Sequence, residues 1–125
     1  MARATGIGGV FFRSKDPEAL RAWYVEHLGL PDDDDDGYVV LKWGSGESGA
    51  TVWSPFPTDT SYFGESGQQW MLNYRVDDLD AMLGQLRARG VRVADEVQEE
   101  PYGRFGWAFD PEGNRFELWE PPQGM

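Results

Sequence analysis

Cysteine is absent from this 125-residue sequence, and histidine occurs only once. Without cysteine there are no disulfides, no thiolate nucleophile and no thiolate metal ligand, a composition that fits a reducing compartment. No stretch reaches the apolar length of a membrane span, and residues 1–13 lack the apolar core of a signal peptide. We therefore expect a cytoplasmic protein that has no membrane partner.

Basic residues are also scarce, because 11 Lys and Arg stand against 22 Asp and Glu, giving a formal net charge of -11. Such a charge repels phosphate backbones and attracts cations, so nucleic acid is not expected as a partner. Five consecutive aspartates occupy residues 32–36. They lack the interspersed ligands and the glycine turn of a calcium loop, and we predict an exposed loop or frayed edge there.

The remaining composition, 40% hydrophobic and 14% aromatic, is typical of one compact domain, although two half-size modules are also possible. In the first half, residues 5–13 predict a strand, and Asp16 with Pro17 predicts the start of a helix that Gly29 ends. The helix face expected to lie on a sheet consists of Leu20, Trp23, Tyr24, His27 and Leu28. Two more strands are predicted at residues 38–43 and 50–54, around a turn at residues 44–49.

The same order of signals returns in the second half. Residues 70–76 predict a strand, Asp78 caps a helix that Gly90 ends, and three further strands are expected at residues 91–97, 104–109 and 115–120. A shift of 62 residues superimposes the first strands and helices, and a shift of 66 places Thr51 on Glu117. We predict a single domain built from two repeated modules, residues 1–55 and 68–125, with a linker at residues 56–67. Because this linker keeps Phe56, Tyr62 and Phe63, we expect it to pack on the other half of the chain, a partner subunit or a ligand.

The closing segment, FDPEGNRFELWEP at residues 109–121, is the most informative stretch. Pro and Gly predict a turn, and the chain then leaves as a strand in which Arg115, Glu117 and Trp119 share one face. A carboxylate in the middle of a strand runs against β propensity. Glu117 is therefore a candidate functional residue, with a solvated sheet face as the alternative interpretation.

These motifs together resemble the vicinal oxygen chelate superfamily, which includes glyoxalases, bleomycin-resistance proteins and extradiol dioxygenases. The resemblance rests on the helix ending WYVEHLGL, the segment YRVDDLDAMLGQLRARGV and the closing DPEGNRFELWEP, in this order. It implies an α+β fold in which two tandem β-α-β-β-β modules form a cup with the helices outside.

The resemblance also implies four metal-ligand positions, which fall on Gly9, Thr51, Met71 and Glu117. Only Glu117 is a suitable ligand for a divalent metal, because glycine has no side chain, a thioether suits soft metals and a neutral threonine hydroxyl binds weakly. A register error of two would bring in Asn73 or Glu47 and still supply no imidazole. His27 lies on the outer helix, so we expect no metal and no other cofactor.

Strand alternation predicts that the cup is lined by aromatic side chains around one acid. The expected ligand-binding residues are Phe11, Trp53, Asn73, Arg75, Trp107, Arg115, Glu117 and Trp119. Such a pocket suits a small aromatic or cationic molecule, through cation–π contact and ion pairing. The alternative is that these aromatics fill the cup as core.

Three functions remain open at this point. The leading one is binding, including antibiotic sequestration of the kind that the resemblance implies. The second is a metal-free enzyme with Glu117 as acid or base and with Arg75 or Arg115 holding an anion. The third, less favoured, is a metal-dependent lyase or dioxygenase. We expect a homodimer, because a half-cup leaves sheet edges exposed.

Overall fold

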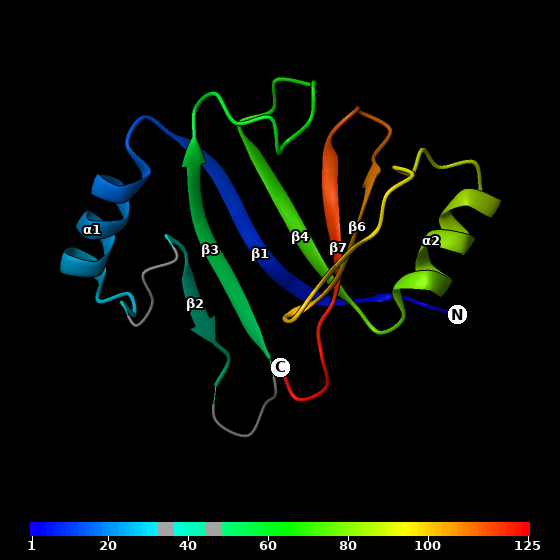
Figure 1. Cartoon of the computed structure of the whole chain (residues 1–125), viewed down its shortest axis with the longest axis horizontal. Helices are drawn as coiled ribbons and strands as arrows, with labels where there is room; N and C mark the ends of the chain where they lie inside the picture. The colour runs from blue at the N-terminus through cyan, green and yellow to red at the C-terminus, as the bar shows by residue number, and fades with distance from the viewer. Residues whose placement is uncertain (33–36, 45–48) are drawn as a thin grey trace.

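The structure is a computed structural model that describes residues 1–32, 37–44 and 49–125. Seven strands form one mixed sheet in the order β2-β3-β1-β4-β7-β6-β5, which curls into a half-barrel between two helices (Figure 1). The elements are β1 Ala4–Ser14, α1 Pro17–Leu28, β2 Val39–Lys42, β3 Ala50–Pro57, β4 Trp70–Val76, α2 Leu79–Ala88, β5 Gln98–Glu100, β6 Gly103–Phe109 and β7 Arg115–Glu120. The α+β cup inferred from the sequence is confirmed. The predicted aspartate loop and the turn at residues 44–49 lie largely outside the described residues.

The two halves of the chain meet at the centre of the sheet. The first strand of each half, β1 and β4, pair antiparallel, and each is flanked on its other side by the last strand of its own half in parallel. The strands therefore follow the same order outward from the centre in both halves. The predicted module boundaries, residues 1–55, 56–67 and 68–125, stay a prediction.

Both helices begin where the sequence predicts. The Asp16 carboxylate accepts a hydrogen bond from the Ala19 amide at 3.1 Å, and the Asp78 carboxylate accepts one from the Ala81 amide at 3.0 Å. These bonds satisfy amides that have no partner within the first helical turn. Helix α1 ends at Gly29, whose φ of 69° is the left-handed conformation that glycine adopts without strain.

The two helices differ in how they pack. Helix α2 buries Leu79, Met82 and Leu83 in a core cluster with Val76 and Leu118. Helix α1 has no buried residue among those described, and Trp23 is 51% exposed. The predicted packing face of α1 is therefore only partly right. Tyr24 does contact the sheet, where its ring centroid lies 5.0 Å from that of Trp53 on β3.

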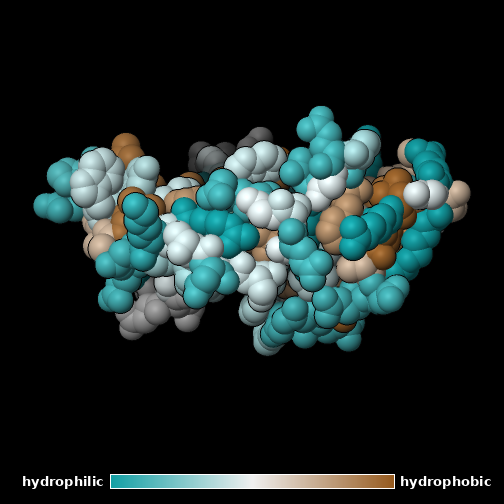
Figure 2. All heavy atoms as spheres, turned by 90° about the horizontal axis from the view of Figure 1, so that it is seen from above, coloured by the Kyte–Doolittle hydropathy of each residue, from teal (hydrophilic) through white to brown (hydrophobic). Residues whose placement is uncertain are grey.

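Hydrophobic patches are visible at both ends of the molecule in the space-filling view, the ends that carry α1 and α2 (Figure 2). Among the described residues, no helix is long and apolar enough to cross a membrane.

One predicted strand, residues 91–97, is wrong in position. The chain pairs with β6 only briefly, through the Ala94 amide to the Trp107 carbonyl and the Phe109 amide to the Arg92 carbonyl. It then leaves the sheet, and regular pairing resumes at β5, three residues of an edge strand. Apolar alternation alone does not reveal how briefly this segment runs beside its neighbouring strand.

The segment between the halves covers one end of the cup, as its aromatic residues predicted. Phe63 is fully buried in a cluster with Phe11, Met71 and Trp107. The Arg13 guanidinium holds the segment by donating to the carbonyls of Gln68, Thr58 and Thr60 at 2.9, 2.7 and 3.0 Å. At this end the aromatic residues fill the cup as core, and the rest of the cup stays open.

Candidate functional site

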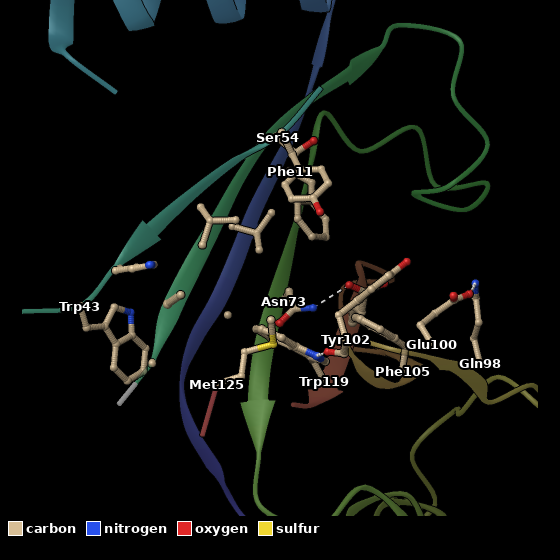
Figure 3. A pocket seen from close by; sticks show the side chains of 18 of the residues that line it. Phe11, Trp43, Ser54, Asn73, Gln98, Glu100, Tyr102, Phe105, Trp119 and Met125 are labelled. Carbon is tan, nitrogen blue, oxygen red and sulfur yellow. Dashed lines mark hydrogen bonds between the residues drawn. The ribbon is translucent and has the colours of Figure 1, made fainter. Parts of the chain in front are cut away.

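The open part of the concave face is a pocket of about 670 Å³, within the range of small-molecule sites. Its walls are mainly apolar, include eight aromatic residues and come from all parts of the sheet (Figure 3). The aromatic lining residues are Phe11, Tyr38, Trp43, Phe56, Tyr62, Tyr102, Phe105 and Trp119. Polar side chains are fewer: Lys42, Ser54, Asn73, Gln98, Glu100 and Glu117.

Glu117 lies at the floor of the pocket and is only 1% exposed. Its Oε1 accepts a hydrogen bond from Asn73 Nδ2 at 2.6 Å, and its Oε2 accepts one from Trp107 Nε1 at 2.9 Å and another from the Tyr62 hydroxyl. These three donors come from β4, β6 and the segment after β3. The cluster therefore joins both halves of the chain around one carboxylate.

Burial dominates the electrostatics of this cluster. Loss of water around Glu117 raises the pKa of its carboxyl, and the hydrogen bonds from Tyr62, Asn73 and Trp107 offset part of this rise. Burial, together with the nearby Glu117 charge, also raises the pKa of Tyr62 far above its usual value. The Tyr62 hydroxyl thus stays protonated and serves as a donor to Glu117.

Half of the predicted ligand-binding residues line the pocket, namely Phe11, Asn73, Glu117 and Trp119. Three others lie just behind the wall. The Arg75 guanidinium lies between the rings of Trp43 and Trp119, 5.0 and 5.2 Å from their centroids. Trp107 reaches the pocket only through its hydrogen bond to Glu117, and the Arg115 guanidinium stacks 5.1 Å from the Trp107 ring.

The eighth residue, Trp53, is a wrong prediction. It points to the opposite face of the sheet, where its ring contacts Phe12 and Tyr24. Thr51 lies two residues before Trp53 on β3 and therefore on the same face of the strand. Its hydroxyl donates to the Ile7 carbonyl at 2.9 Å. The observed pairs Phe11–Ser54 and Asn73–Glu117 show that Ser54, at a shift of 63, is the counterpart of Glu117. The predicted shift of 66 differs by an odd number, which places side chains on the wrong face.

A bulge in β1 changes which glycine faces the site. The pairing with β4 slips between Ile7 and Gly9, and Gly8, rather than the predicted Gly9, lines the pocket. A Cβ on Gly8 would meet Asn73 and Trp119, whereas one on Gly9 would meet the Phe11 ring. Alternation read from the sequence cannot register such an irregularity.

The site does not fit the divalent metal of the superfamily's metal enzymes. Among the described residues, no group of three or more His, Cys, Asp and Glu side chains could hold a metal ion. Met71 is fully buried in the core cluster, so it is not available at the site. The oxygens of Glu117 face three N–H and O–H donors, whose positive ends oppose a cation.

Sequence reasoning missed several lining residues, above all Tyr62 as a partner of Glu117. Its aromatic character inside a Pro- and Gly-rich segment was the available signal, and it indicated packing without naming the contact. Residues of the two edge strands were also missed: Val40 and Lys42 on β2, and Gln98 and Glu100 on β5.

Comparison with known proteins identifies the family. The model of the glyoxalase-like domain matches residues 9–119, so the chain belongs to the glyoxalase-like family of the vicinal oxygen chelate superfamily. No curated protein sequence matches the chain significantly.

Solved structures share the fold. Methylmalonyl-CoA epimerase from Mycobacterium tuberculosis is similar with a TM-score of 0.63 and 28% identity, over 95% of this chain and 89% of that chain. A Streptomyces coelicolor methylmalonyl-CoA epimerase variant in complex with 2-nitronate-propionyl-CoA is similar with a TM-score of 0.73 and 18% identity. The match covers 98% of this chain and 99% of that chain. A glyoxalase/bleomycin resistance protein/dioxygenase superfamily member from Vibrio splendidus 12B01 has a TM-score of 0.58 and 13% identity. The match covers 96% of this chain and 99% of that chain.

Proposed function

We propose that the protein binds a small planar molecule, aromatic and cationic, in the pocket of the concave face. The observation that carries this proposal is a cavity of about 670 Å³ whose lining contains eight aromatic residues and few polar side chains. Apolar walls with a few convergent polar groups are the usual form of a small-molecule site.

Two features favour a planar cation over other ligands. Phe105 and Trp119 both line the pocket with parallel rings, 6.1 Å between centroids and 4° between planes, and form an aromatic wall of the pocket. Planar rings stack on aromatic side chains, and cations are attracted to aromatic faces. The net charge of -11 raises the local concentration of cations around the protein. Sequestration of a planar cationic antibiotic is the role that we propose within the family.

Tryptophan fluorescence tests this proposal directly. Titration with a planar cationic dye such as methylene blue is expected to give saturable quenching in the native protein. Trp119→Ala removes part of the aromatic wall and is expected to weaken binding about tenfold, the loss of roughly 1.4 kcal/mol of stacking. Trp70→Ala is the matched control, because Trp70 is 48% exposed and lies outside the pocket. Quenching that does not saturate, or an equal loss in both variants, contradicts the proposal.

Acid–base catalysis is a second candidate, supported by the raised pKa of Glu117 and its hydrogen bond to Tyr62. A carboxyl whose pKa moves toward neutrality is suited to proton transfer. The 28% identity to a methylmalonyl-CoA epimerase also favours it. The geometry favours binding over catalysis, because both Glu117 oxygens already accept hydrogen bonds.

Proton exchange measures this second candidate. If Glu117 acts as a base, methylmalonyl-CoA incubated with the protein in deuterated water exchanges its α proton faster than buffer alone, and Glu117→Gln loses at least about 100-fold of that rate. Glu112→Gln, in the exposed turn before β7, is the control and keeps the full rate. An exchange rate equal to that of buffer rejects catalysis on this substrate.

We also propose a homodimer, because β2 and β5 end the sheet as edge strands and α1 exposes apolar side chains such as Trp23 and Leu28. Sedimentation velocity distinguishes the dimer from a monomer of 14.1 kDa, and a single monomeric species would reject it.

A further inference from the structure

We propose that Asn73 Oδ1 is the ligand-recognition atom of the pocket and that it accepts a hydrogen bond from an N–H or O–H group of the planar ligand. The inference rests on the proposed binding function and narrows it. It selects ligands that carry a hydrogen-bond donor at the ring edge over fully N-alkylated ones.

The orientation of the Asn73 amide follows from its neighbour. Asn73 Nδ2 lies 2.6 Å from Glu117 Oε1, and an oxygen of the ionised carboxylate can only accept in this contact. The nitrogen end of the amide must therefore face Glu117, and the oxygen end must face the opposite way. In Figure 3 this oxygen points away from the dashed hydrogen bond, toward the side of the pocket where Trp119 and Met125 lie.

The oxygen of this amide has no hydrogen-bond partner among the described residues, although Asn73 is only 2% exposed. A buried acceptor without a partner is destabilising, because it has lost its bonds to water and gained none in return. A ligand with an N–H or O–H group forms the missing hydrogen bond to this oxygen and removes the destabilisation. A ligand without such a group does not. The unpaired oxygen thus gives the floor of the pocket a preference for ligands that carry a hydrogen-bond donor.

A glycine makes room for this arrangement. A side chain on Gly8 would overlap Asn73 Oδ1 and come within 2.8 Å of Trp119 Cε3. Gly8, Asn73 and Trp119 all line the pocket, so the acceptor is set beside the aromatic wall on which a ring would stack. Met125, a flexible side chain, also lines the pocket and is drawn on this side of Asn73 in Figure 3.

The other polar groups of the cluster do not compete for the ligand. The Tyr62 hydroxyl and the Trp107 indole N–H both donate to Glu117 Oε2, and the carboxylate itself is 1% exposed. The floor of the pocket therefore presents Asn73 Oδ1 as its acceptor, with donors turned inward. A positive charge without an N–H group gains attraction from the walls but forms no hydrogen bond here.

Two dyes with the same ring system test this inference. Thionine and methylene blue are both planar phenothiazinium cations, but thionine carries two NH2 groups where methylene blue carries two dimethylamino groups. Titrations followed by tryptophan quenching are expected to show thionine binding about tenfold more tightly, equivalent to one hydrogen bond of about 1.4 kcal/mol. Equal affinity in the native protein overturns the inference and leaves the binding function intact.

Methylene blue is also larger than thionine, because it carries four methyl groups. Asn73→Leu distinguishes the effect of the hydrogen bond from the effect of this difference in size. The leucine keeps the approximate size of the asparagine and removes the oxygen, so the tenfold preference for thionine over methylene blue is expected to disappear. Glu112→Gln, in the exposed turn before β7 and outside the pocket, is the control and keeps the preference. Asn73→Ala replaces the leucine variant if that protein does not fold. A preference that survives loss of Asn73 overturns the inference, and failure of both dyes to bind the native protein rejects the planar-cation function itself.

Discussion

Gly8→Ala is expected to lower the free energy of unfolding by about 1–3 kcal/mol, the usual cost of adding a methyl group to a filled space. The added Cβ would overlap Asn73 Oδ1, approach Trp119 Cε3 to 2.8 Å and approach Arg75 Cγ to 3.1 Å. None of these atoms is the free end of an exposed side chain, so the strands or the Asn73–Glu117 pair must shift. Planar-cation binding is expected to fall at least about tenfold in the same variant, since it depends on this wall.

Gly84→Ala is the matched control for this experiment. Gly84 lies in the interior of α2, and a Cβ there meets no atom within 4 Å. Alanine is the better helix former, so this variant is expected to gain about 0.5–1 kcal/mol. Urea denaturation followed by tryptophan fluorescence measures both changes. Stability changes of the same sign in the two variants would contradict the contacts described for Gly8.

The pH dependence of stability is expected to change in Glu117→Gln. Burial raises the pKa of Glu117 in the folded state above its ordinary value of 4.5. At a pH just above 4.5 the folded protein therefore still holds a proton on Glu117 that the unfolded chain has already released. The unfolding free energy then falls as pH rises from 4.5 to the folded-state pKa, by at most about 1.4 kcal/mol per pH unit, and levels off above it. Glutamine does not titrate, so the variant loses this part of the slope.

Unfolding free energies of both proteins, measured from below pH 4.5 to neutral pH, give the result as a difference. Other carboxyls, such as Asp80 and Asp110 with their lowered pKa values, contribute equally to both proteins and cancel. The difference, native minus variant, is expected to decrease with rising pH. Glu112→Gln, in an exposed turn, is expected to leave the pH profile unchanged. A difference that grows with pH would mean that the hydrogen bonds to Glu117 outweigh its burial.

Much of the fold could be predicted from the sequence because its signals are local. Asp16 and Asp78 cap helices through bonds to amides three residues away, and Gly29 ends α1 by its own backbone conformation. The closing strand, with Glu117 facing the cup, follows from a turn and from alternation over six residues. Comparison of the two halves predicted a shift of 62, and the two caps stand at equivalent places in the halves with this spacing.

The site was less predictable, because its geometry depends on contacts between distant segments. The pairing of β3 with β1 decides which residues of β3 face the cup. The predicted shift between the halves was wrong by three residues, an odd number, so Trp53 and Thr51 were assigned to the wrong face. The β1 bulge likewise brought Gly8 to the pocket. Neither feature has a signature in the pattern of apolar residues, because both arise from how one strand is paired with another.

The sequence by itself determined the family fold, the aromatic character of the cup and the isolation of Glu117 from any histidine or cysteine, because composition and local backbone preferences suffice for these. Only the tertiary structure decided the partners of that carboxylate. Tyr62 and Asn73 lie 55 and 44 residues away in the sequence, and they reach Glu117 because the segment after β3 folds over the sheet while β4 pairs with β7. Long-range packing of this kind is cooperative, so the direction of the Asn73 amide follows from the assembled sheet and not from any single segment.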